Sequence, residues 1–291
     1  MDYVFVIAGL IGLFLGGEAL VRGSVGIARR MAVPPLLIGL TVVGFGTSTP
    51  ELLVSVDAAL RGVPDIAVGN IIGSNIANIL LIVGVSALVW PIRISGSTLR
   101  RDTGVMMAAT LILVPIFAMG EVARLSGLVL FVGLAMYLAW AYLRPGPAQA
   151  DSDADAPPAS TLVSVLLVDG AVSIARGYGI SEAFIGLTIV AIGTSLPELA
   201  TSLIAALRRQ SEIAIGNIVG SNIFNLLGIL GVTAMVTPIP VAPRFLSFDL
   251  PVLVAVSLVL TGLLLTRPTI GRGAGAVMLA GYFAYIWFAQ G

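Results

Sequence analysis

The 291-residue sequence contains no cysteine, no histidine and no lysine. Without cysteine there are no disulfides, no thiolate metal sites and no cysteine nucleophiles. Without histidine, the commonest metal ligand and the commonest general base are both missing. All fifteen basic residues are arginines, and no basic cluster exceeds two adjacent ones. Nucleic-acid binding therefore has no support in the sequence.

Charged residues of either sign are also scarce. They make up 10% of the chain, against about 25% in a soluble domain, and the net charge is zero. Hydrophobic residues make up 58%, and the mean hydropathy is +1.06. This composition is typical of a protein that lies in a lipid bilayer. The first apolar run is too long for a signal peptide and lacks a preceding basic segment, so we expect no cleavable signal.

The apolar residues form ten runs, most of them long enough as helices to cross about 30 Å of hydrocarbon. We therefore expect an all-α polytopic membrane protein with ten transmembrane helices. The ten runs cover roughly residues 3–28, 34–60, 65–90, 103–120, 125–143, 160–177, 181–207, 211–237, 248–266 and 273–289.

A segment rich in proline and aspartate, residues 144–159, separates the first five runs from the last five. Its composition predicts a disordered acidic linker, which the arginine distribution below assigns to the cytoplasmic side. The chain then divides into a first five-helix unit at 1–143, the linker at 144–159, and a second five-helix unit at 160–291.

The two units are copies of each other. The motif GTSTPE at 46–51 returns as GTSLPE at 193–198, and GNIIGSN at 69–75 returns as GNIVGSN at 216–222. Further matches at the same offset of 147 residues are Ile38 with Ile185, Pro91 with Pro238, and Asp102 with Asp249. Because five is odd, the second copy enters the membrane upside down. This predicts an inverted repeat, in which transporters hold their substrate near the midplane.

The arginines predict the orientation. If both termini lie outside, ten arginines fall on the inner side and four on the outer side, which follows the positive-inside rule. The inner set is Arg29, Arg30, Arg93, Arg100, Arg101, Arg144, Arg208, Arg209, Arg267 and Arg272, and the outer set is Arg61, Arg124, Arg176 and Arg244. We expect a multi-pass protein of the cell (plasma) membrane.

Each copy of the GTSxPE motif places a glutamate, Glu51 or Glu198, inside an apolar span. An acidic residue at the centre of a membrane helix costs roughly 3 kcal/mol. No basic residue lies at comparable depth in these spans to neutralise it. A protonated structural acid is the plain alternative, but its duplication at equivalent positions indicates that the two glutamates act together on a cation.

Hydroxyl groups flank each glutamate. Thr47 and Glu51 are four residues apart and share a helix face, with Ser48 beside them. Pro50 lacks an N–H and clashes with the preceding turn, so we expect a broken helix whose freed carbonyls face a ligand. The second copy repeats this arrangement with Thr194, Ser195, Pro197 and Glu198.

The span that follows each motif adds further oxygens. Ser74 and Asn78 are four residues apart and lie on one helix face. The second copy repeats them as Ser221 and Asn225. For Asn75 and Asn222 we favour hydrogen bonds between helices over contact with a ligand. Together these side chains predict an all-oxygen site for a hard cation such as calcium, which takes six to eight oxygen ligands.

GTSTPE and GTSLPE, with GNIIGSNIANIL and GNIVGSNIFNLL, resemble the two alpha-repeats of the calcium:cation antiporter superfamily, and its prokaryotic sodium/calcium exchangers in particular. The resemblance covers nearly the whole chain. It implies that Glu51 and Glu198 ligate calcium and sodium, and that the first and sixth helices slide across the core as a gate. The further ligands that it implies are Thr47, Ser48, Thr194, Ser195, Ser74, Ser221, Asn78, Asn225, and the carbonyls of Gly44 and Ala191.

Two features depart from the family pattern. Some relatives have aspartate where this chain has Asn225, so the site holds two carboxylates instead of three, which leaves the ion stoichiometry open. The sixth run has barely 18 residues against about 25 in the first, and Asp169 lies within it. We do not assign Asp169 a role.

The resulting hypothesis is an antiporter that expels calcium in exchange for sodium by alternating access, with calcium and sodium as transported ions and no prosthetic group. The alternative is a calcium/proton antiporter that uses the same glutamates. A channel lacks a repeated filter sequence here, and an intramembrane enzyme lacks its catalytic residues. The lipid bilayer and the ions are the expected partners, and a single chain suffices to build the site.

Overall fold

The computed structural model describes residues 44–93, 97–143 and 181–290. The helices expected over 3–28 and 160–177, the linker at 144–159 and Asp169 lie outside these ranges. The helix expected over 34–60 is described from Gly44 onward.

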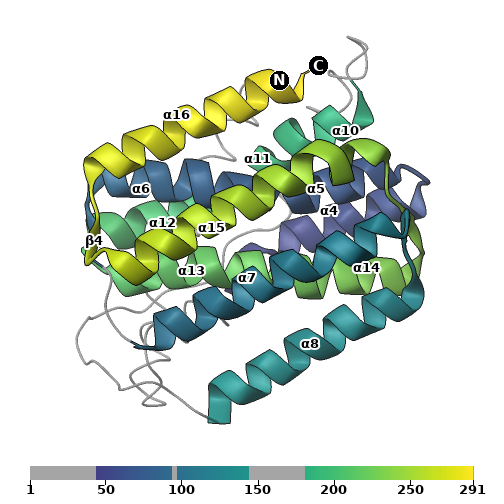
Figure 1. Cartoon of the computed structure of the whole chain (residues 1–291), viewed down its shortest axis with the longest axis horizontal. Coiled ribbons are helices and arrows are strands. Elements are labelled where there is room, and N and C mark those ends of the chain that lie inside the picture. Colours follow the sequence, from purple (N-terminus) through teal and green to yellow (C-terminus); the bar gives the residue numbers. More distant parts are fainter. Residues whose placement is uncertain (1–43, 94–96, 144–180, 291) are drawn as a thin grey trace, which may run out of the picture.

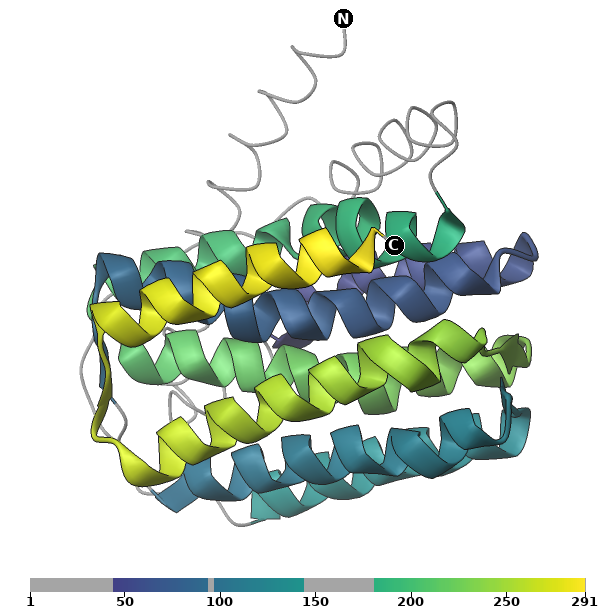
Figure 2. The same ribbon diagram turned by 45° about the horizontal axis from the view of Figure 1, so that its top comes forward.

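The described part of the first half contains helices α3 (Gly44–Thr47), α4 (Thr49–Leu60), α5 (Pro64–Ala77), the π-helical turn η2 (Asn78–Ile82), α6 (Val83–Val89), α7 (Ser97–Ala118) and α8 (Arg124–Leu143), with two short strands, β1 (Ile92–Arg93) and β2 (Glu121–Val122). The described part of the second half contains α10 (Glu182–Ile185), η3 (Gly186–Val190), α11 (Ala191–Thr194), α12 (Leu196–Leu207), α13 (Ser211–Ile223), η4 (Phe224–Ile229), α14 (Leu230–Val236), β3 (Ile239–Pro240), η5 (Phe245–Asp249), α15 (Leu250–Thr266), β4 (Thr269–Ile270) and α16 (Arg272–Ala289). The long helices run side by side (Figures 1 and 2).

Five of the described helices are long and apolar enough to cross a membrane: Pro64–Val89, Leu99–Ala118, Arg124–Leu143, Ser211–Val236 and Phe245–Thr266. The pair Glu182–Thr194 and Leu196–Leu207 is bent by 46° and counts as a sixth if it is one span. The helix expected over 273–289 is present as α16, and its crossing of the membrane stays a prediction. The chain is therefore a mostly helical, multi-pass membrane protein.

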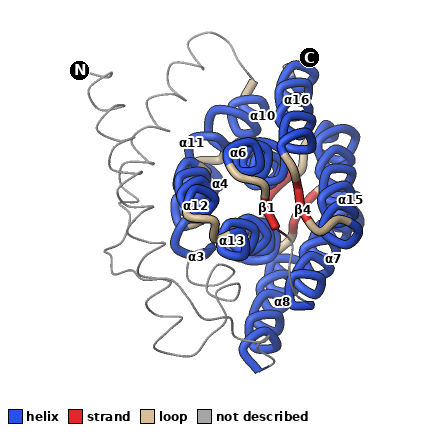
Figure 3. Tube along the Cα trace, turned by 90° about the vertical axis from the view of Figure 1, so that its left-hand side faces the viewer, coloured by secondary structure: helices blue, strands red, loops and turns tan. Residues whose placement is uncertain are grey.

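The helices differ strongly in how deeply they are buried. In the continuous helix α13–α14, 100% of the apolar window is buried, and in α5–α6 83%, against 28% in α8 and 33% in η5–α15. In the end-on view of Figure 3, α16, α15, α7 and α8 form a row along one side of α6 and α13, while α4 and α12 lie on the other side. The two central helices carry the duplicated GNIxGSN motifs, so the fold places these polar residues at its centre.

Contacts between the halves recur with the halves exchanged. Strand β1 of the first half pairs with β4 of the second, and β2 pairs with β3. A Cβ on Gly84 would meet the Gly275 carbonyl at 3.0 Å, and a Cβ on Gly127 would meet the Gly231 carbonyl at 2.6 Å. Gly84 and Gly231 are repeat equivalents. Such exchange is what a two-fold relation produces, and the ten-helix inverted repeat stays a prediction because two of its helices lie outside the described ranges.

The arginines separate to the two ends of the described bundle. One end carries β1 and β4, and the other carries β2 and β3. The elements at the β1–β4 end hold Arg93, Arg100, Arg101, Arg208, Arg209, Arg267 and Arg272, and those at the β2–β3 end hold Arg61, Arg124 and Arg244. This is the partition that the sequence predicts for the described arginines.

Candidate cation-binding site

The two GTSxPE motifs break their helices in the same way. Helix α3 ends at Thr47 and α4 begins at Thr49, while α11 ends at Thr194 and α12 begins at Leu196. The intervening Ser48 has φ −84° and ψ 6°, and its equivalent Ser195 has φ −83° and ψ 5°. A proline sits in the first turn after each break, where its missing N–H costs nothing. The predicted break at Pro50 is confirmed.

Glu51 and Glu198 occupy the first turns of the helices that start at these breaks. Both side chains are fully buried, with 0% exposure. The partial positive charge of a helix N-terminus stabilises a carboxylate at this position. None of the ion pairs between described residues involves either carboxylate. Two buried negative charges without a basic partner require a cation or protons.

Each glutamate is held by a serine from the other half. Ser48 Oγ donates to Glu198 Oε1 at 3.0 Å, and Ser195 Oγ donates to Glu51 Oε1 at 3.1 Å. The second carboxylate oxygen, Oε2, of each glutamate has no hydrogen-bond partner among the described residues. The arrangement thus fixes one oxygen of each carboxylate and leaves the other to a ligand.

Threonines and further serines surround this pair. Thr47 Oγ1 lies 3.4 Å from Ser221 Oγ, and Thr194 Oγ1 lies 3.5 Å from Ser74 Oγ. Ser221 also donates to Glu198 Oε1 at 3.4 Å. All of these side chains are at most 1% exposed. The helix break in one half therefore faces the GNIxGSN helix of the other half.

Two of the predicted ligands are backbone carbonyls. The Gly44 carbonyl accepts from Thr47 Oγ1 at 3.3 Å, and the Ala191 carbonyl accepts from Ser74 Oγ at 3.4 Å. Each also accepts the backbone N–H of the break residue, Ser48 or Ser195. These carbonyls belong to the same cluster of oxygens, and each has hydrogen-bond partners in the protein.

Two asparagines in the GNIxGSN motifs hold the site together and are missing from the residues chosen from sequence. Asn70 Nδ2 donates to the Glu51 carbonyl at 3.2 Å and to Ser55 Oγ at 2.9 Å, and its Oδ1 accepts from Thr194 at 2.9 Å. The equivalent contacts in the other half are made by Asn217 with Glu198, Ser202 and Thr47. The available signal was that Asn70 and Ser55 recur at the same offset of 147 residues.

The remaining predicted ligands, Asn78 and Asn225, lie in the π-helical turns η2 and η4, which the sequence did not predict. Such turns appear frequently at functional sites. Asn78 Nδ2 donates to Asn222 Oδ1 at 3.0 Å, which confirms the hydrogen bond between helices expected for Asn222. For Asn75 that expectation is wrong, because its Nδ2 donates to the Ile71 carbonyl of its own helix at 2.7 Å.

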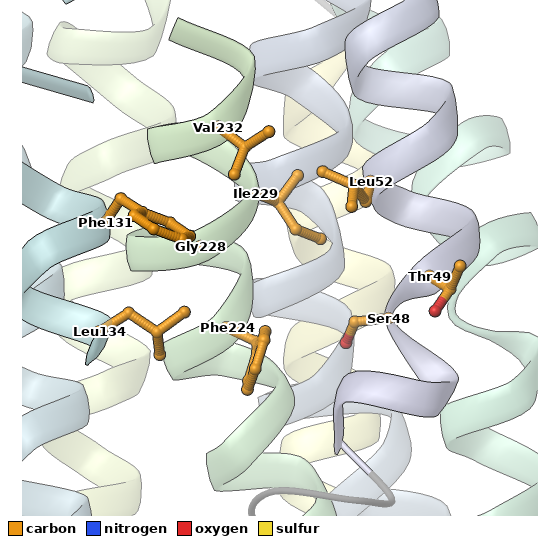
Figure 4. A pocket seen from close by; sticks show the side chains of 9 residues that line it. All are labelled: Ser48, Thr49, Leu52, Phe131, Leu134, Phe224, Gly228, Ile229 and Val232. Carbon is orange, nitrogen blue, oxygen red and sulfur yellow. The ribbon is translucent and has the colours of Figure 1, made fainter. Parts of the chain in front are cut away.

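An apolar cavity of about 60 Å³ lies beside the first break, between α4, α8 and η4–α14 (Figure 4). Its lining consists of Ser48, Thr49, Leu52, Phe131, Leu134, Phe224, Gly228, Ile229 and Val232. Almost the whole lining is hydrocarbon, so it offers a hard cation no set of oxygen ligands. The candidate cation site is therefore the cluster around the two glutamates, and this cavity is apolar.

The chemistry of the cluster is uniform. Its candidate ligand atoms are carboxylate, hydroxyl, amide and carbonyl oxygens, and the sequence contains neither histidine nor cysteine, which supply the nitrogen and thiolate ligands of zinc sites. Among the described residues, no three or more histidine, cysteine, aspartate or glutamate side chains lie close enough together to hold a metal ion. A charge of −2 on two glutamates matches one divalent cation or two monovalent ones.

Known proteins are similar to this chain in sequence and in fold. Residues 1–143 and 159–290 match the protein family described as "Sodium/calcium exchanger protein". The chain is 35% identical to inner membrane protein YrbG of Escherichia coli over 98% of this chain and 95% of that one. It is 31% identical to the sodium/calcium exchanger MaX1 of Methanosarcina acetivorans over 98% of this chain and 97% of that one.

A solved structure has the same fold. The sodium-calcium exchanger NCX_Mj, soaked with 10 mM Na⁺ and no Ca²⁺, superposes with a TM-score of 0.81 at 34% sequence identity. The match covers 98% of each chain. This chain and NCX_Mj are thus similar in fold and in sequence along nearly the full length of both.

Proposed function

Because this chain belongs to the sodium/calcium exchanger family, and is accordingly a membrane cation antiporter and not an enzyme, we propose that it moves calcium in exchange for sodium by alternating access. Both ions bind the cluster around Glu51 and Glu198. Because they compete for the same oxygens, one ion leaves only when the other loads.

One observation carries the proposal. Glu51 and Glu198 are fully buried and lack a basic partner among the described residues, and each is fixed by a serine of the opposite half. A permanently buried pair of like charges is unfavourable unless a cation neutralises it. Calcium neutralises both carboxylates at once, and so do two sodium ions. The pair therefore supports exchange between one divalent and at least two monovalent cations.

The other predicted ligands complete the coordination. Calcium takes six to eight oxygens at 2.3–2.6 Å, as a rule. Two carboxylates supply up to four of them, and the others are drawn from a set of ten further oxygens, those of Thr47, Thr194, Ser48, Ser195, Ser74, Ser221, Asn78, Asn225 and the carbonyls of Gly44 and Ala191. With asparagine at position 225, the site has no third charge, so we expect its ion stoichiometry to be set by two carboxylates alone.

The architecture proposed for this mechanism is ten helices in two inverted five-helix units at 1–143 and 160–291, working as a single chain with both termini outside. The excess of arginines at the β1–β4 end of the described bundle over those at the β2–β3 end supports this orientation. The exchange of strand and glycine contacts between the halves supports the two-fold relation. The first and sixth helices, which the resemblance makes the gate, lie outside the described residues.

Calcium-45 uptake into sodium-loaded proteoliposomes tests the coupling. An outward sodium gradient should drive uptake, and collapse of that gradient should stop it. Uptake that ignores sodium but follows a pH gradient would replace the proposal with the alternative, calcium/proton exchange. Uptake that follows neither gradient would reject both.

The site is tested by Glu51→Gln and Glu198→Gln, each of which keeps the side-chain volume and removes the charge. Either substitution should abolish sodium-driven uptake and leave the protein folded in detergent. Glu121→Gln, at an exposed glutamate in β2, is the matched control and should transport like the wild type. Normal flux in Glu51→Gln or Glu198→Gln would refute the assignment.

A further inference from the structure

Most hydrogen bonds of the cluster occur twice, with the two halves exchanged. Five contacts of Asn70, Glu51, Ser74 and their partners have an equivalent contact at positions 147 residues away. Ser74 and Ser221 differ in their other acceptors, as rotating hydroxyls can. The asparagines of the π-helical turns differ more deeply, because one of them has a side-chain partner and the other has none among the described residues.

Asn222 of the second half forms a chain of hydrogen bonds with two side chains of the first half. Asn222 Nδ2 donates to Met106 Sδ at 3.7 Å, and Asn222 Oδ1 accepts from Asn78 Nδ2 at 3.0 Å. All three side chains are at most 1% exposed. Since an amide has one oxygen and one NH₂ group, the methionine contact turns the oxygen of Asn222 toward Asn78.

The repeat-equivalent positions, 147 residues away, lack this chain. The equivalent of Met106 is Leu253, a buried residue with no hydrogen-bond acceptor in its side chain. Asn75, the equivalent of Asn222, instead donates to its own helix at the Ile71 carbonyl. Within the described ranges, neither polar atom of the buried Asn225 has a hydrogen-bond partner. A single difference in residue type, methionine against leucine, accompanies the asymmetry.

The hydrogen bond to Asn222 determines which way the carboxamide of Asn78 faces. Its only NH₂ group is engaged by Asn222, and its Oδ1 has no partner within the described part of the chain. Asn78 is therefore fixed as an oxygen donor to a cation, whereas Asn225 is not fixed in either direction. We propose that Met106 and Asn222 are positioning residues that hold the Asn78 carboxamide with its oxygen toward the cation, so that Asn78 binds calcium more tightly than Asn225 does.

This inference rests on the proposed function, and the tests separate the two. Calcium-45 binding to the purified protein in detergent measures affinity whatever the counter-ion is. Met106→Leu removes the acceptor with little change in volume, so folding should survive. Asn222→Leu removes the partner of Asn78 itself. Both should raise the half-saturating calcium concentration by roughly three- to tenfold, as expected for the loss of one neutral hydrogen bond.

The pseudo-symmetry supplies matched controls. Asn75→Leu and Leu253→Met make changes at the repeat-equivalent positions, which lack the chain, and both variants should bind calcium within about twofold of the wild type. In proteoliposomes, Met106→Leu should raise the half-saturating calcium concentration and leave the maximal rate close to wild type, which a general loss of folded protein would not do.

Two outcomes overturn the inference. The first is unchanged calcium affinity in Met106→Leu, with thermal unfolding like the wild type. The second is an equal loss of affinity in Met106→Leu and Leu253→Met, which would mean that packing and not amide orientation matters. Either result leaves sodium-driven uptake by the wild type intact. Failure of that uptake would reject the proposed function and leave the binding result to be judged separately.

Discussion

Ser195 donates a 3.1 Å hydrogen bond to Oε1 of Glu51, across 144 residues of chain. The same bond recurs with the halves exchanged, from Ser48 to Glu198 at 3.0 Å. Each carboxylate is thus placed by one half of the protein and oriented by the other. Any motion of one half against the other changes the geometry of both carboxylates together, as the proposed exchange of two ions at one site requires.

Ser48 and Ser195 should contribute equally to calcium binding. Ser195→Ala and Ser48→Ala each remove a hydrogen bond to a buried charge, which is worth about 1.5–3 kcal/mol. We expect each substitution to raise the half-saturating calcium concentration at least tenfold in calcium-45 uptake. A tenfold effect in one variant and none in the other would contradict an equal division of the site between the halves.

Asn70 should contribute mainly to the stability of the fold around the helix break at Ser48. Its NH₂ group bonds the Glu51 carbonyl and Ser55, so Asn70→Ala leaves two buried acceptors without their donor. We expect the free energy of unfolding to fall by about 2 kcal/mol, measured by thermal unfolding in detergent. Ser55→Ala should cost less in the Asn70→Ala background than in the wild type, since the two groups share one bond. Additive costs would show that this bond contributes nothing.

Gly127 should be required for close packing of α8 on α14. A Cβ there would lie 2.6 Å from the Gly231 carbonyl, so Gly127→Ala forces the helices apart at a cost of about 1–3 kcal/mol. Gly133 lies in the same helix with nothing within 4 Å of its Cβ position. Gly133→Ala should therefore be neutral or stabilising by up to about 1 kcal/mol, because alanine favours the helix. Equal unfolding temperatures for the two variants would refute this packing.

The features that could be predicted from the sequence are those that depend on local chemistry or on the repeated motif. The break at Pro50 follows from the missing N–H, and the meeting of Glu51 with Ser195 follows from the duplication of one motif. The role of Asn70 was not predicted, because its hydrogen bonds to Glu51, Ser55 and Thr194 depend on the packing of other helices against its own. The π-helical turn at Asn78 has no comparable local signal.

Alignment of the two repeats also fails to predict structure where equivalent positions hold different residues or have different partners. Arg209 adopts φ 60° at the position equivalent to Gly62, which has φ 73°, and its guanidinium lies 4.3 Å from the Trp90 ring centroid. The repeat equivalents Asp102 and Asp249 are both buried. Their partners, however, are Arg101 at the preceding position and Arg244 five residues earlier. Only the folded structure identifies such partners.

Asp249 should be the most sensitive charge outside the cation site. It is fully buried, accepts from Arg244 Nε at 3.1 Å and from Tyr285 Oη at 3.0 Å, and Arg244 also donates to the Ala289 carbonyl at the end of α16. Arg244→Leu leaves the carboxylate buried without its counter-charge, so the free energy of unfolding should fall by about 3–5 kcal/mol. Tyr285→Phe should cost less, because the ion pair remains.

The double variant Arg244→Leu with Asp249→Asn separates charge from packing. Removing both charges relieves the uncompensated carboxylate, so most of the stability lost in Arg244→Leu should return in thermal unfolding. If the double variant is as unstable as the single one, Arg244 acts through its bond to the end of α16 and not through Asp249. Calcium-45 binding should be unchanged in every folded member of this series, because the cluster around Asp249 shares no hydrogen bond with the cation site in the described ranges.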